Sequence, residues 1–372
     1  DDIMNLVTMK DYIYATPAKV LENVKNAEML VKPIVDLYIK KNYKKITFVA
    51  SGSSYTAIQC ARGFLCEKLR NDVKVINPFT FSEYDYRYVT DDEFVVIVSQ
   101  TGASTNCISA LQKLDQINHE KYVLTGNVES DCKAYADTML DWGCGIETMG
   151  YVTLGVVTLI NYLMLFAVYA AQALQLEDSI EYTKNQIIKA MNNHKIVCQD
   201  SEKFITENYQ ALMQMDRVYV LGAGSNYGTA LEGALKIGET VKVLAVGYEQ
   251  DEFLHGPALQ LSPQYTAFVI DSGDQTADHA KQVFNGLLKV VKNTFMITPN
   301  KDINHSQVLY IQDSCDEPFT CLYNLAFFEL IAEIISTDLN SKKSHPLYYE
   351  MNKVIDFRTS EFRKTHSSDE DD

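Results

Sequence analysis

The chain is short of positive charge. Its 372 residues include 33 lysines and arginines against 49 aspartates and glutamates, which gives a formal net charge of −16. No basic stripe is present that could neutralise the phosphates of a nucleic acid or of an anionic membrane, so we expect neither as a partner. A small anionic ligand is not excluded, because a phosphate site is a local arrangement of donors and dipoles.

Several signatures of metal and cofactor binding are also missing. The eight cysteines form no CxxC pair and the seven histidines are dispersed, so we expect no metal site. Cysteines scattered through apolar runs indicate reduced core residues in a cytoplasmic protein. The sequence has neither a Walker Gly-Lys nor a GxGxxG motif, so a bound phosphate would belong to a small ester rather than to a nucleotide.

Two features bear on membranes and export. The N-terminal residues show no basic region followed by an apolar core, so no signal peptide is expected. The most apolar segment, residues 156–174, approaches membrane-spanning length but contains Asn161 and Gln172. Because this segment lies inside an alternating strand and helix pattern, we interpret it as a buried helix rather than as a membrane span.

The fold class follows from short apolar runs that alternate with stretches of helical spacing. Such alternation implies right-handed crossovers and a parallel sheet. The pattern occurs twice, so we predict an α/β protein of two three-layer αβα units with parallel, flavodoxin-like sheets. The predicted strands are 46–50, 73–76, 94–98, 121–125 and 138–141 in the first half, and 217–221, 243–246, 265–270, 294–297 and 308–311 in the second.

The repeat suggests the domain organisation. We assign residues 1–205 to the first unit, 206–340 to the second and 341–372 to a C-terminal tail. The first unit includes polar bridging helices within 176–215.

The two ends of the chain carry their own predictions. Residues 1–30 indicate a lead-in helix with Pro17 at a helix start. The acidic run 367–372 at the other end favours disorder.

Two predicted strands of the first half end in hydroxyl-rich turns, at 51–54 and 99–105. Short hydroxyl donors, backbone N–H groups and the positive end of a helix dipole together suit a dianionic phosphate. The alternative is an ordinary helix N-cap made by Ser104 or Thr105. Since ligands of open parallel sheets sit beyond the carboxyl ends of the strands, two such turns can converge on one anion, which favours the phosphate site.

The corresponding turn of the second half differs. It carries Asp271 and Asp274, which would repel a phosphate. We therefore expect one phosphate site per chain, in the first half.

Acid and base groups gather in the second half. Glu232, Lys236 and Glu239 fall on one face of a helix predicted from about 229 to 241. A solvated, salt-bridged surface is the alternative, but small and apolar flanking residues weaken it. His255 lies in a loop that ends in Gly-Pro, where a merely structural role also stays open. A carboxylate and an imidazole beside a sugar phosphate are what enolisation needs.

Four segments together carry a resemblance to a known family. They are Ser-Gly-Ser-Ser-Tyr (51–55), Ser-Gln-Thr-Gly-Ala-Ser (99–104), Ala-Leu-Glu-Gly-Ala-Leu-Lys-Ile-Gly-Glu (230–239) and Glu-Phe-Leu-His-Gly-Pro (252–257). With them, roughly residues 30–340 resemble the tandem sugar-isomerase (SIS) domain family. The chain is similar to the isomerase half of glucosamine-6-phosphate synthase and to the fructosamine-6-phosphate deglycases. Leu154 stands where family members commonly have lysine.

The resemblance implies roles for these residues. Glu239 would be the base next to the sugar carbonyl, and His255 would assist ring opening from a neighbouring subunit, which implies a homodimer or larger homo-oligomer. The implied reaction is cleavage of a fructosamine-type (Amadori) 6-phosphate, such as glucoselysine 6-phosphate, with no metal or cofactor. An isomerase or deaminase is the alternative, and a sugar-phosphate sensor a weaker one. The implied substrate-binding residues are Gly52, Ser53, Ser54, Ser99, Gln100, Thr101, Gly102, Ser104, Glu232 and Lys236.

Overall fold

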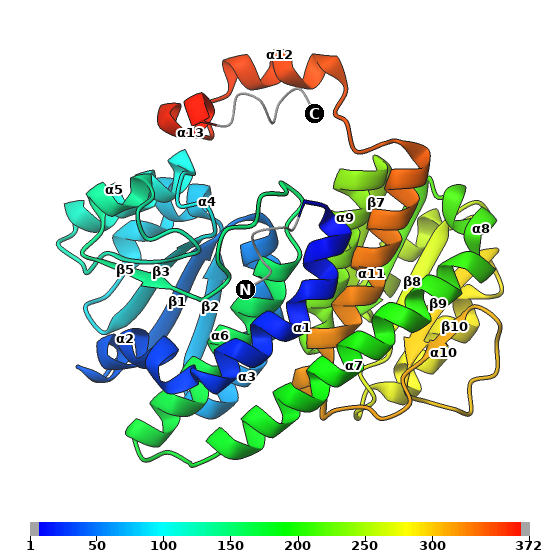
Figure 1. Ribbon diagram of the computed structural model, residues 1–372, viewed down its shortest axis with the longest axis horizontal. Coiled ribbons are helices and arrows are strands. Elements are labelled where there is room, and N and C mark those ends of the chain that lie inside the picture. The colour runs from blue at the N-terminus through cyan, green and yellow to red at the C-terminus, as the bar shows by residue number, and fades with distance from the viewer. Residues whose placement is uncertain (1–6, 366–372) are drawn as a thin grey trace.

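A computed structural model describes residues 7–365 of the chain. The acidic run 367–372, for which the sequence favours disorder, lies outside the described residues. Figure 1 shows two α/β units side by side, with the first half of the chain in blue to cyan and the second half in green to orange.

The first unit is built on a five-stranded parallel sheet in the order β2-β1-β3-β4-β5. This is the flavodoxin-like order, and it confirms the predicted fold class. All seven residues of β3 are buried, as expected for a strand covered on both faces. The strands are β1 (Lys45–Ala50), β2 (Asp72–Ile76), β3 (Glu93–Ser99), β4 (Tyr122–Thr125) and β5 (Thr138–Asp141).

The second unit repeats this architecture. Its sheet has the order β10-β9-β8-β6-β7 and is also parallel throughout. Numbered within the unit, the strands run in the same order as those of the first sheet, which confirms the internal repeat. The strands are β6 (Arg217–Gly222), β7 (Leu244–Glu249), β8 (Thr266–Ile270), β9 (Asn293–Thr298) and β10 (Val308–Tyr310).

The N-terminal helix corrects one expectation. Pro17 lies inside α1 (Met9–Lys25) and not at a helix start. The start is fixed by Thr8, whose hydroxyl accepts a hydrogen bond from the Asp11 amide at 3.1 Å while the Asp11 carboxylate accepts one from the Thr8 amide at 3.0 Å. This reciprocal capping box outweighs the preference of proline for the first helical position. The other helices of this unit are α2 (Ala27–Ile39), α3 (Gly52–Leu69), α4 (Pro78–Glu83), η2 (Asp85–Tyr88), α5 (Thr105–Gln116), η3 (Asp131–Tyr135) and α6 (Leu154–Ala173).

Two helices, α6 and α11 (Glu317–Leu339), are long and apolar enough to cross a membrane by length and composition. In each of them 94% of the apolar window is buried inside the protein, which is typical of a core helix. The interpretation of 156–174 as a buried helix is therefore confirmed. All eight cysteines are free, and seven of them are buried.

The units are joined by long helices. The helix α7 (Ile180–Glu207) packs on α1 and α6 of the first unit and on α11 of the second, and α9 packs on α3. Helix α7 therefore contacts both units. The remaining helices are α8 (Tyr209–Met213), α9 (Ser225–Val241), η4 (Glu252–Leu254), η5 (Pro257–Gln260) and α10 (Ala277–Leu287).

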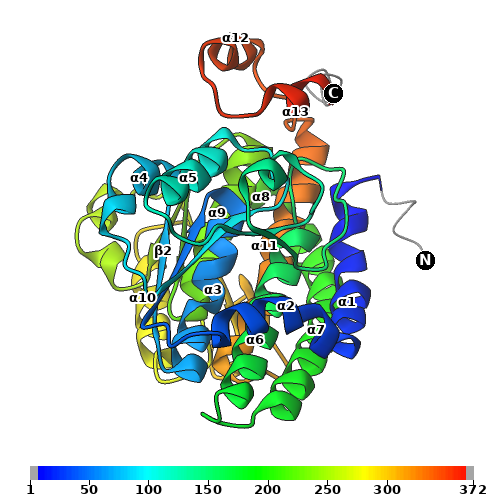
Figure 2. The same ribbon diagram turned by 90° about the vertical axis from the view of Figure 1, so that its left-hand side faces the viewer.

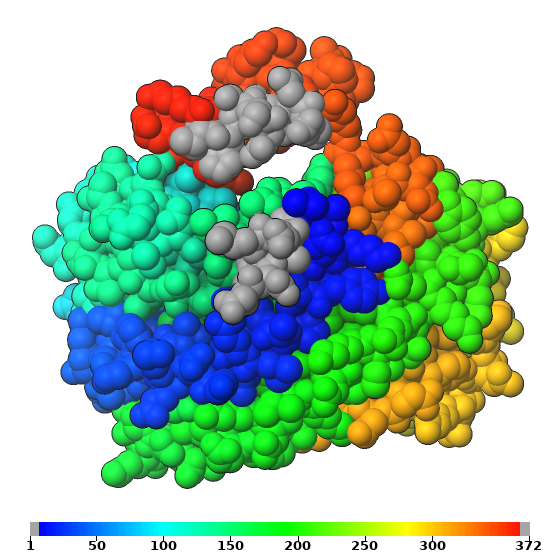
Figure 3. Space-filling view, in the orientation of Figure 1, coloured from blue at the N-terminus to red at the C-terminus, as the bar shows by residue number. Residues whose placement is uncertain are grey.

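The C-terminal segment leaves α11 and passes over the first unit. It forms α12 (Pro346–Val354) and α13 (Ser360–Thr365) above the side of the molecule where α4 and α5 lie (Figures 1 and 2). Its helix α12 has no buried residues. In Figure 3 this orange and red segment stands above the body as an arch.

Candidate active site

The two hydroxyl-rich turns of the first unit lie together. They follow β1 and β3, which are paired neighbours in the sheet, with Ala50 opposite Val98. The Asn106 side-chain amide also donates to the Ser51 hydroxyl at 3.4 Å and links the turns. Since β2 lies on one side of this strand pair and β4 on the other, the turns stand at the point where the strand order reverses, which is where open α/β sheets bind ligands.

The first turn leaves a helix end uncapped. Helix α3 begins at Gly52, whose φ of +57° favours glycine, and within the described residues no side chain caps this end. The first amides of a helix have no partner within the helix, so this end offers donors to an anion. Ser53 and Ser54, which follow, are half-buried.

The second turn is shaped by its own side chains. The Ser99 hydroxyl accepts a hydrogen bond from the Gly102 amide at 3.1 Å, and Thr101 accepts one from the Ala103 amide at 3.3 Å. Gly102 has a φ of +64°, and a Cβ there would lie 1.8 Å from the Ser130 hydroxyl oxygen. Ser104 stands at the N-cap of α5 but makes no capping hydrogen bond, so the ordinary N-cap alternative is not what the structure shows.

Gln100 is held by Glu147, which is not among the predicted site residues. Its amide donates to Glu147 at 3.0 Å, and Glu147 also accepts from the Thr153 and Gly155 amides at the start of α6, at 2.7 and 2.9 Å. Burial raises the pKa of Glu147, while these hydrogen bonds act in the opposite direction. An acidic residue just ahead of a long apolar helix is the signal that could have indicated this cap.

The predicted acid and base residues form one cluster. Lys236 Nζ lies 2.5 Å from Glu239 Oε1 and 3.2 Å from Glu232 Oε1. The side chains of Lys236 and Glu232 are 1% and 0% exposed, so the solvated-surface alternative is wrong. This face of α9 is turned into the protein.

The cluster is anchored on the first unit. Ser53 Oγ donates to Glu232 Oε1 at 3.0 Å and accepts from Lys236 Nζ at the same distance, while Thr56 Oγ1 donates to Glu232 Oε2 at 2.5 Å. The first turn of α3 therefore contacts the acid and base residues of α9 directly. The two units therefore meet beside the turn 51–54.

The members of this cluster differ in their pKa shifts and in their exposure to solvent. Burial alone would lower the pKa of Lys236, but the adjacent Glu232 and Glu239 outweigh it and raise that pKa. Burial raises the pKa of Glu239, and Lys236 partly opposes the shift. The Glu239 side chain is 30% exposed and is the one member of the trio that reaches solvent. A carboxylate with a raised pKa and access to a ligand is suited to removing a proton from carbon.

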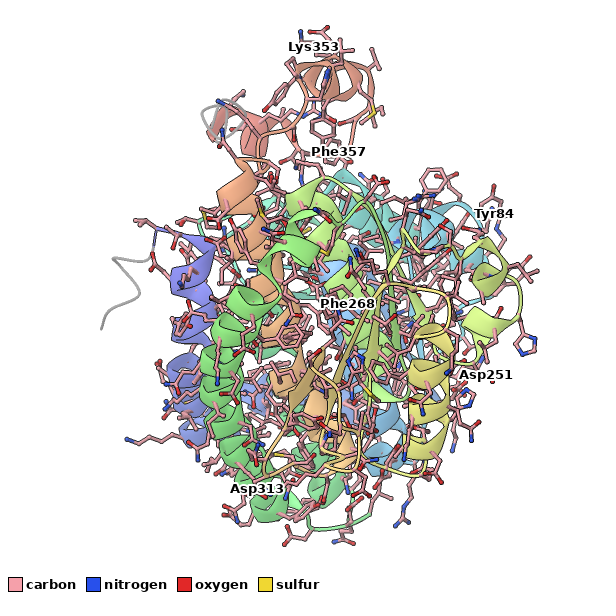
Figure 4. The ribbon with its side chains drawn as sticks, turned by 90° about the vertical axis from the view of Figure 1, so that its right-hand side faces the viewer. Tyr84, Asp251, Phe268, Asp313, Lys353 and Phe357 are labelled. Atoms are coloured by element: carbon pink, nitrogen blue, oxygen red, sulfur yellow. The ribbon has the colours of Figure 1, made fainter. Side chains whose placement is uncertain are left out.

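His255 is not brought to this cluster within the chain. Its imidazole is 69% exposed and lies 3.5 Å from Asp251. Figure 4 shows Asp251 at the edge of the molecule. Across residues 7–365, no ion pair or hydrogen bond connects His255 to Glu239. Leu254 and Leu259 on the same loop are exposed. Its action from a neighbouring subunit stays a prediction.

The fold and the site define a class of protein. It has two flavodoxin-like units, one with an uncapped, hydroxyl-lined ligand edge, and an acid–base cluster where the units meet. Residues 211–309 match the family model described as the SIS domain.

Known proteins are similar to this chain in sequence or in fold. The chain is 26% identical over 270 residues to the glutamine–fructose-6-phosphate aminotransferase (isomerizing) of Thermococcus kodakarensis, covering 72% of this chain and 44% of that one. The chain thus spans less than half the length of this relative. A proposed phosphosugar isomerase from Clostridium difficile 630 has a structure with a TM-score of 0.82 and 25% identity, covering 97% of this chain and 98% of the other.

The C-terminal domain of glucosamine-fructose-6-phosphate aminotransferase from Francisella tularensis has the same fold. Its TM-score is 0.76 at 20% identity, covering 91% and 98% of the two chains. The SIS domain match thus lies in the second unit of this chain, and both units together have the fold of these two structures.

Proposed function

We propose that the chain is a phosphosugar enzyme that cleaves a fructosamine-type 6-phosphate to glucose 6-phosphate and a free amine. The observation that carries this proposal is the geometry of Glu239. It is a partly exposed carboxylate with a raised pKa, held 2.5 Å from the buried Lys236, whose ammonium also donates to Ser53 in the first hydroxyl-rich turn. Proton removal next to a sugar carbonyl needs such a base.

The reaction divides into balanced steps. Glu239 removes a proton from carbon 1 of the Amadori compound, and protonation of the carbonyl oxygen gives an enaminol. Return of the proton from Glu239 to carbon 2 gives an iminium between carbon 1 and the amine nitrogen, and loss of its N–H proton to water, which balances the proton taken up by the carbonyl oxygen, gives the imine. Water adds to carbon 1, the carbon–nitrogen bond breaks, and glucose 6-phosphate and the amine leave. Lys236 remains charged between two carboxylates and holds the Glu239 carboxylate in place.

The substrate phosphate is assigned to the turns. The uncapped start of α3 and the residues Ser99, Thr101 and Ser104 supply neutral donors, and Gln100 is oriented by Glu147. His255 would act from a second copy of the chain in a cytoplasmic homodimer or larger homo-oligomer. The exposed Leu254 and Leu259 beside it are the apolar surface that such a contact would cover.

An aldose–ketose or amino-sugar-phosphate isomerase is the second candidate. It is favoured by the isomerising activity named for the Thermococcus relative and for the Clostridium structure. Both reactions begin with the same proton removal. They differ in whether water then releases an amine, so the products distinguish them.

The test is a Glu239→Gln substitution combined with a substrate panel. Phosphorylated Amadori compounds, fructose 6-phosphate and glucosamine 6-phosphate are offered to the wild-type chain, and glucose 6-phosphate and amine release are measured. We expect turnover of the Amadori compounds, and a fall in kcat of about a hundredfold to ten-thousandfold in the variant, because general-base catalysis contributes about that much. Glucose 6-phosphate should still bind the variant.

Glu207→Gln, on the exposed surface of α7, is the matched control and should leave kcat unchanged. Turnover of fructose 6-phosphate without amine release would replace the deglycase proposal by the isomerase. Wild-type kcat in Glu239→Gln would remove Glu239 from the mechanism.

A further inference from the structure

We propose that Arg358, on the C-terminal segment, is the cation that pairs with the substrate phosphate at the turn 99–105. This inference rests on the function proposed above and deepens it. It assigns a binding residue that belongs to neither α/β unit and that lies 254 positions from the turn it contacts.

The backbone holds Arg358 in register with the turn. Arg358 and Ser104 form an antiparallel β-bridge. On either side of it, the Thr105 amide donates to the Phe357 carbonyl at 3.3 Å and the Thr359 amide to the Ala103 carbonyl at 3.0 Å. The label of Phe357 in Figure 4 marks where the segment comes down on the body. The C-terminal segment that forms the arch of Figure 3 is therefore bound to the proposed phosphate turn by backbone hydrogen bonds.

The side chain of Arg358 points at the same turn. Its Nη1 donates to the Ser104 hydroxyl at 2.6 Å, and its guanidinium lies 5.4 and 5.5 Å from the ring centres of Phe357 and Phe362. No other hydrogen bond to residues 99–105 within the described part of the chain has a cationic donor. The cation is thus placed among neutral donors.

Arg358 lacks a compensating carboxylate. Across residues 7–365 it forms no ion pair, whereas the nearby Arg363 lies 3.6 Å from Asp356. Arg358 is half-buried, and a charged group withdrawn from water calls for a partner of opposite sign. A guanidinium has five N–H donors, and one hydrogen bond to Ser104 leaves donors for the oxygens of a phosphate ester, which a planar fork matches well.

The charge balance of the site supports this assignment. A phosphate monoester carries close to two negative charges at neutral pH, and the turns supply hydroxyls and amides only. Lys236 is already engaged by Glu232 and Glu239. Arg358 would supply the positive charge that the turns lack. The β-bridge would hold the backbone of Arg358 beside the turn, so that less conformational entropy is lost when the side chain binds the phosphate.

The test uses the full chain with Arg358→Ala and Arg358→Gln. Glutamine keeps a donor for Ser104 but removes the charge, so it also covers the case in which the alanine variant does not fold. Binding of glucose 6-phosphate and of glucose is measured by calorimetry. We expect the Kd for glucose 6-phosphate to rise about ten- to a hundredfold in both variants, as for loss of a charged hydrogen bond, with no change for glucose. In turnover, KM should rise and kcat should change little.

Lys353→Ala is the matched control. Lys353 lies in α12 of the same segment, is 67% exposed and pairs with Glu350, so its loss should leave the Kd unchanged. Arg358→Lys keeps the charge and should recover part of the affinity.

The outcomes separate the two proposals. If the segment is only a structural latch, amide exchange at Thr105 and Thr359 will speed up in Arg358→Gln while the Kd for glucose 6-phosphate stays the same. That result overturns the assignment of Arg358 alone. If the wild-type chain itself binds no sugar phosphate, the proposed function fails first and the Arg358 assignment fails with it.

Discussion

The two units share one strand order but fill the reversal point of the sheet differently. In the first unit the start of α3 carries no side-chain cap, and the neighbouring turn holds hydroxyls. In the second, the Glu317 carboxylate accepts a hydrogen bond from the Ser225 amide at 2.8 Å, at the start of α9. The N-terminus of a helix that follows a strand presents unpaired backbone N–H groups and the positive end of the helix dipole, so it can bind an anion. Whether a carboxylate of the protein itself fills this anion site depends on the side chains around the helix start.

The second unit also keeps other acids at its reversal point. Asp271 accepts hydrogen bonds from the Thr298 hydroxyl at 2.6 Å and from the Gly273 amide at 2.8 Å. This unit therefore has no need of an external anion, and its helix α9 is turned instead towards the first unit, where Glu232 bonds Ser53 and Thr56. The comparison indicates a division of labour in which one unit binds and the other supplies acid and base.

The largest expected effect is at the contact between the units. Lys236→Met would leave Glu232, which is 0% exposed, without its counter-charge. Removing one partner of a buried ion pair costs about 3–5 kcal/mol, so we expect a loss of that size in the free energy of unfolding, measured by urea denaturation.

Lys32→Met is the control for this variant. Lys32 is 67% exposed and pairs with Asp36 one turn along α2, where an exposed pair contributes well under about 1 kcal/mol. Equal losses in the two variants would show that the cluster does not join the units as described.

The second effect tests how the second unit tolerates a buried acid. Both carboxylate oxygens of Glu329 on α11 are buried without a hydrogen-bond partner within the described residues. Burial, followed by the nearby Glu232, raises the pKa of Glu329 from 4.5 to about 8. The folded chain then binds this proton more tightly than the unfolded chain, so its stabilising effect is complete below pH 4.5 and is lost as the pH rises towards 8.

Glu329→Gln should remove this pH dependence. One pKa unit corresponds to about 1.4 kcal/mol, so the variant should gain stability relative to wild type by a few kcal/mol between pH 5 and pH 8. Denaturation at pH 5, 6.5 and 8 measures the difference, with the exposed Glu350→Gln as control. Parallel stability curves for wild type and Glu329→Gln would mean that Glu329 is not protonated in the folded chain.

The sequence was sufficient for the sheets because parallel strands buried on both faces are continuous apolar runs. The ends of the helices were harder to predict from the sequence, since they depend on single side chains. The Thr8 capping box placed Pro17 inside α1, and α9 begins at Ser225 rather than near 229.

Parts of the site were also predictable, because Glu232, Lys236 and Glu239 share a helix face by spacing alone. The residues that form hydrogen bonds with the predicted site residues are remote from them in sequence. Ser53 and Glu232 are 179 positions apart, Gln100 and Glu147 are 47 apart, and Ser104 and Arg358 are 254 apart. The hydrophobic periodicity of the sequence cannot predict such pairs, because they form only when the chain has folded.

The smallest effect concerns the occupied helix start of the second unit. Glu317→Ala removes the acceptor of the Ser225 amide, and loss of such a cap costs about 1–2 kcal/mol of unfolding free energy. Asp271 and Asp274 follow β8, the strand beside β6 at this reversal point, so their charges would oppose an incoming phosphate. We therefore expect calorimetry to give one bound glucose 6-phosphate per chain in both the variant and the wild type, with Glu207→Ala as the stability control. A second binding event in Glu317→Ala would show that Glu317 alone keeps the two units different, and that Asp271 and Asp274 contribute nothing to the distinction.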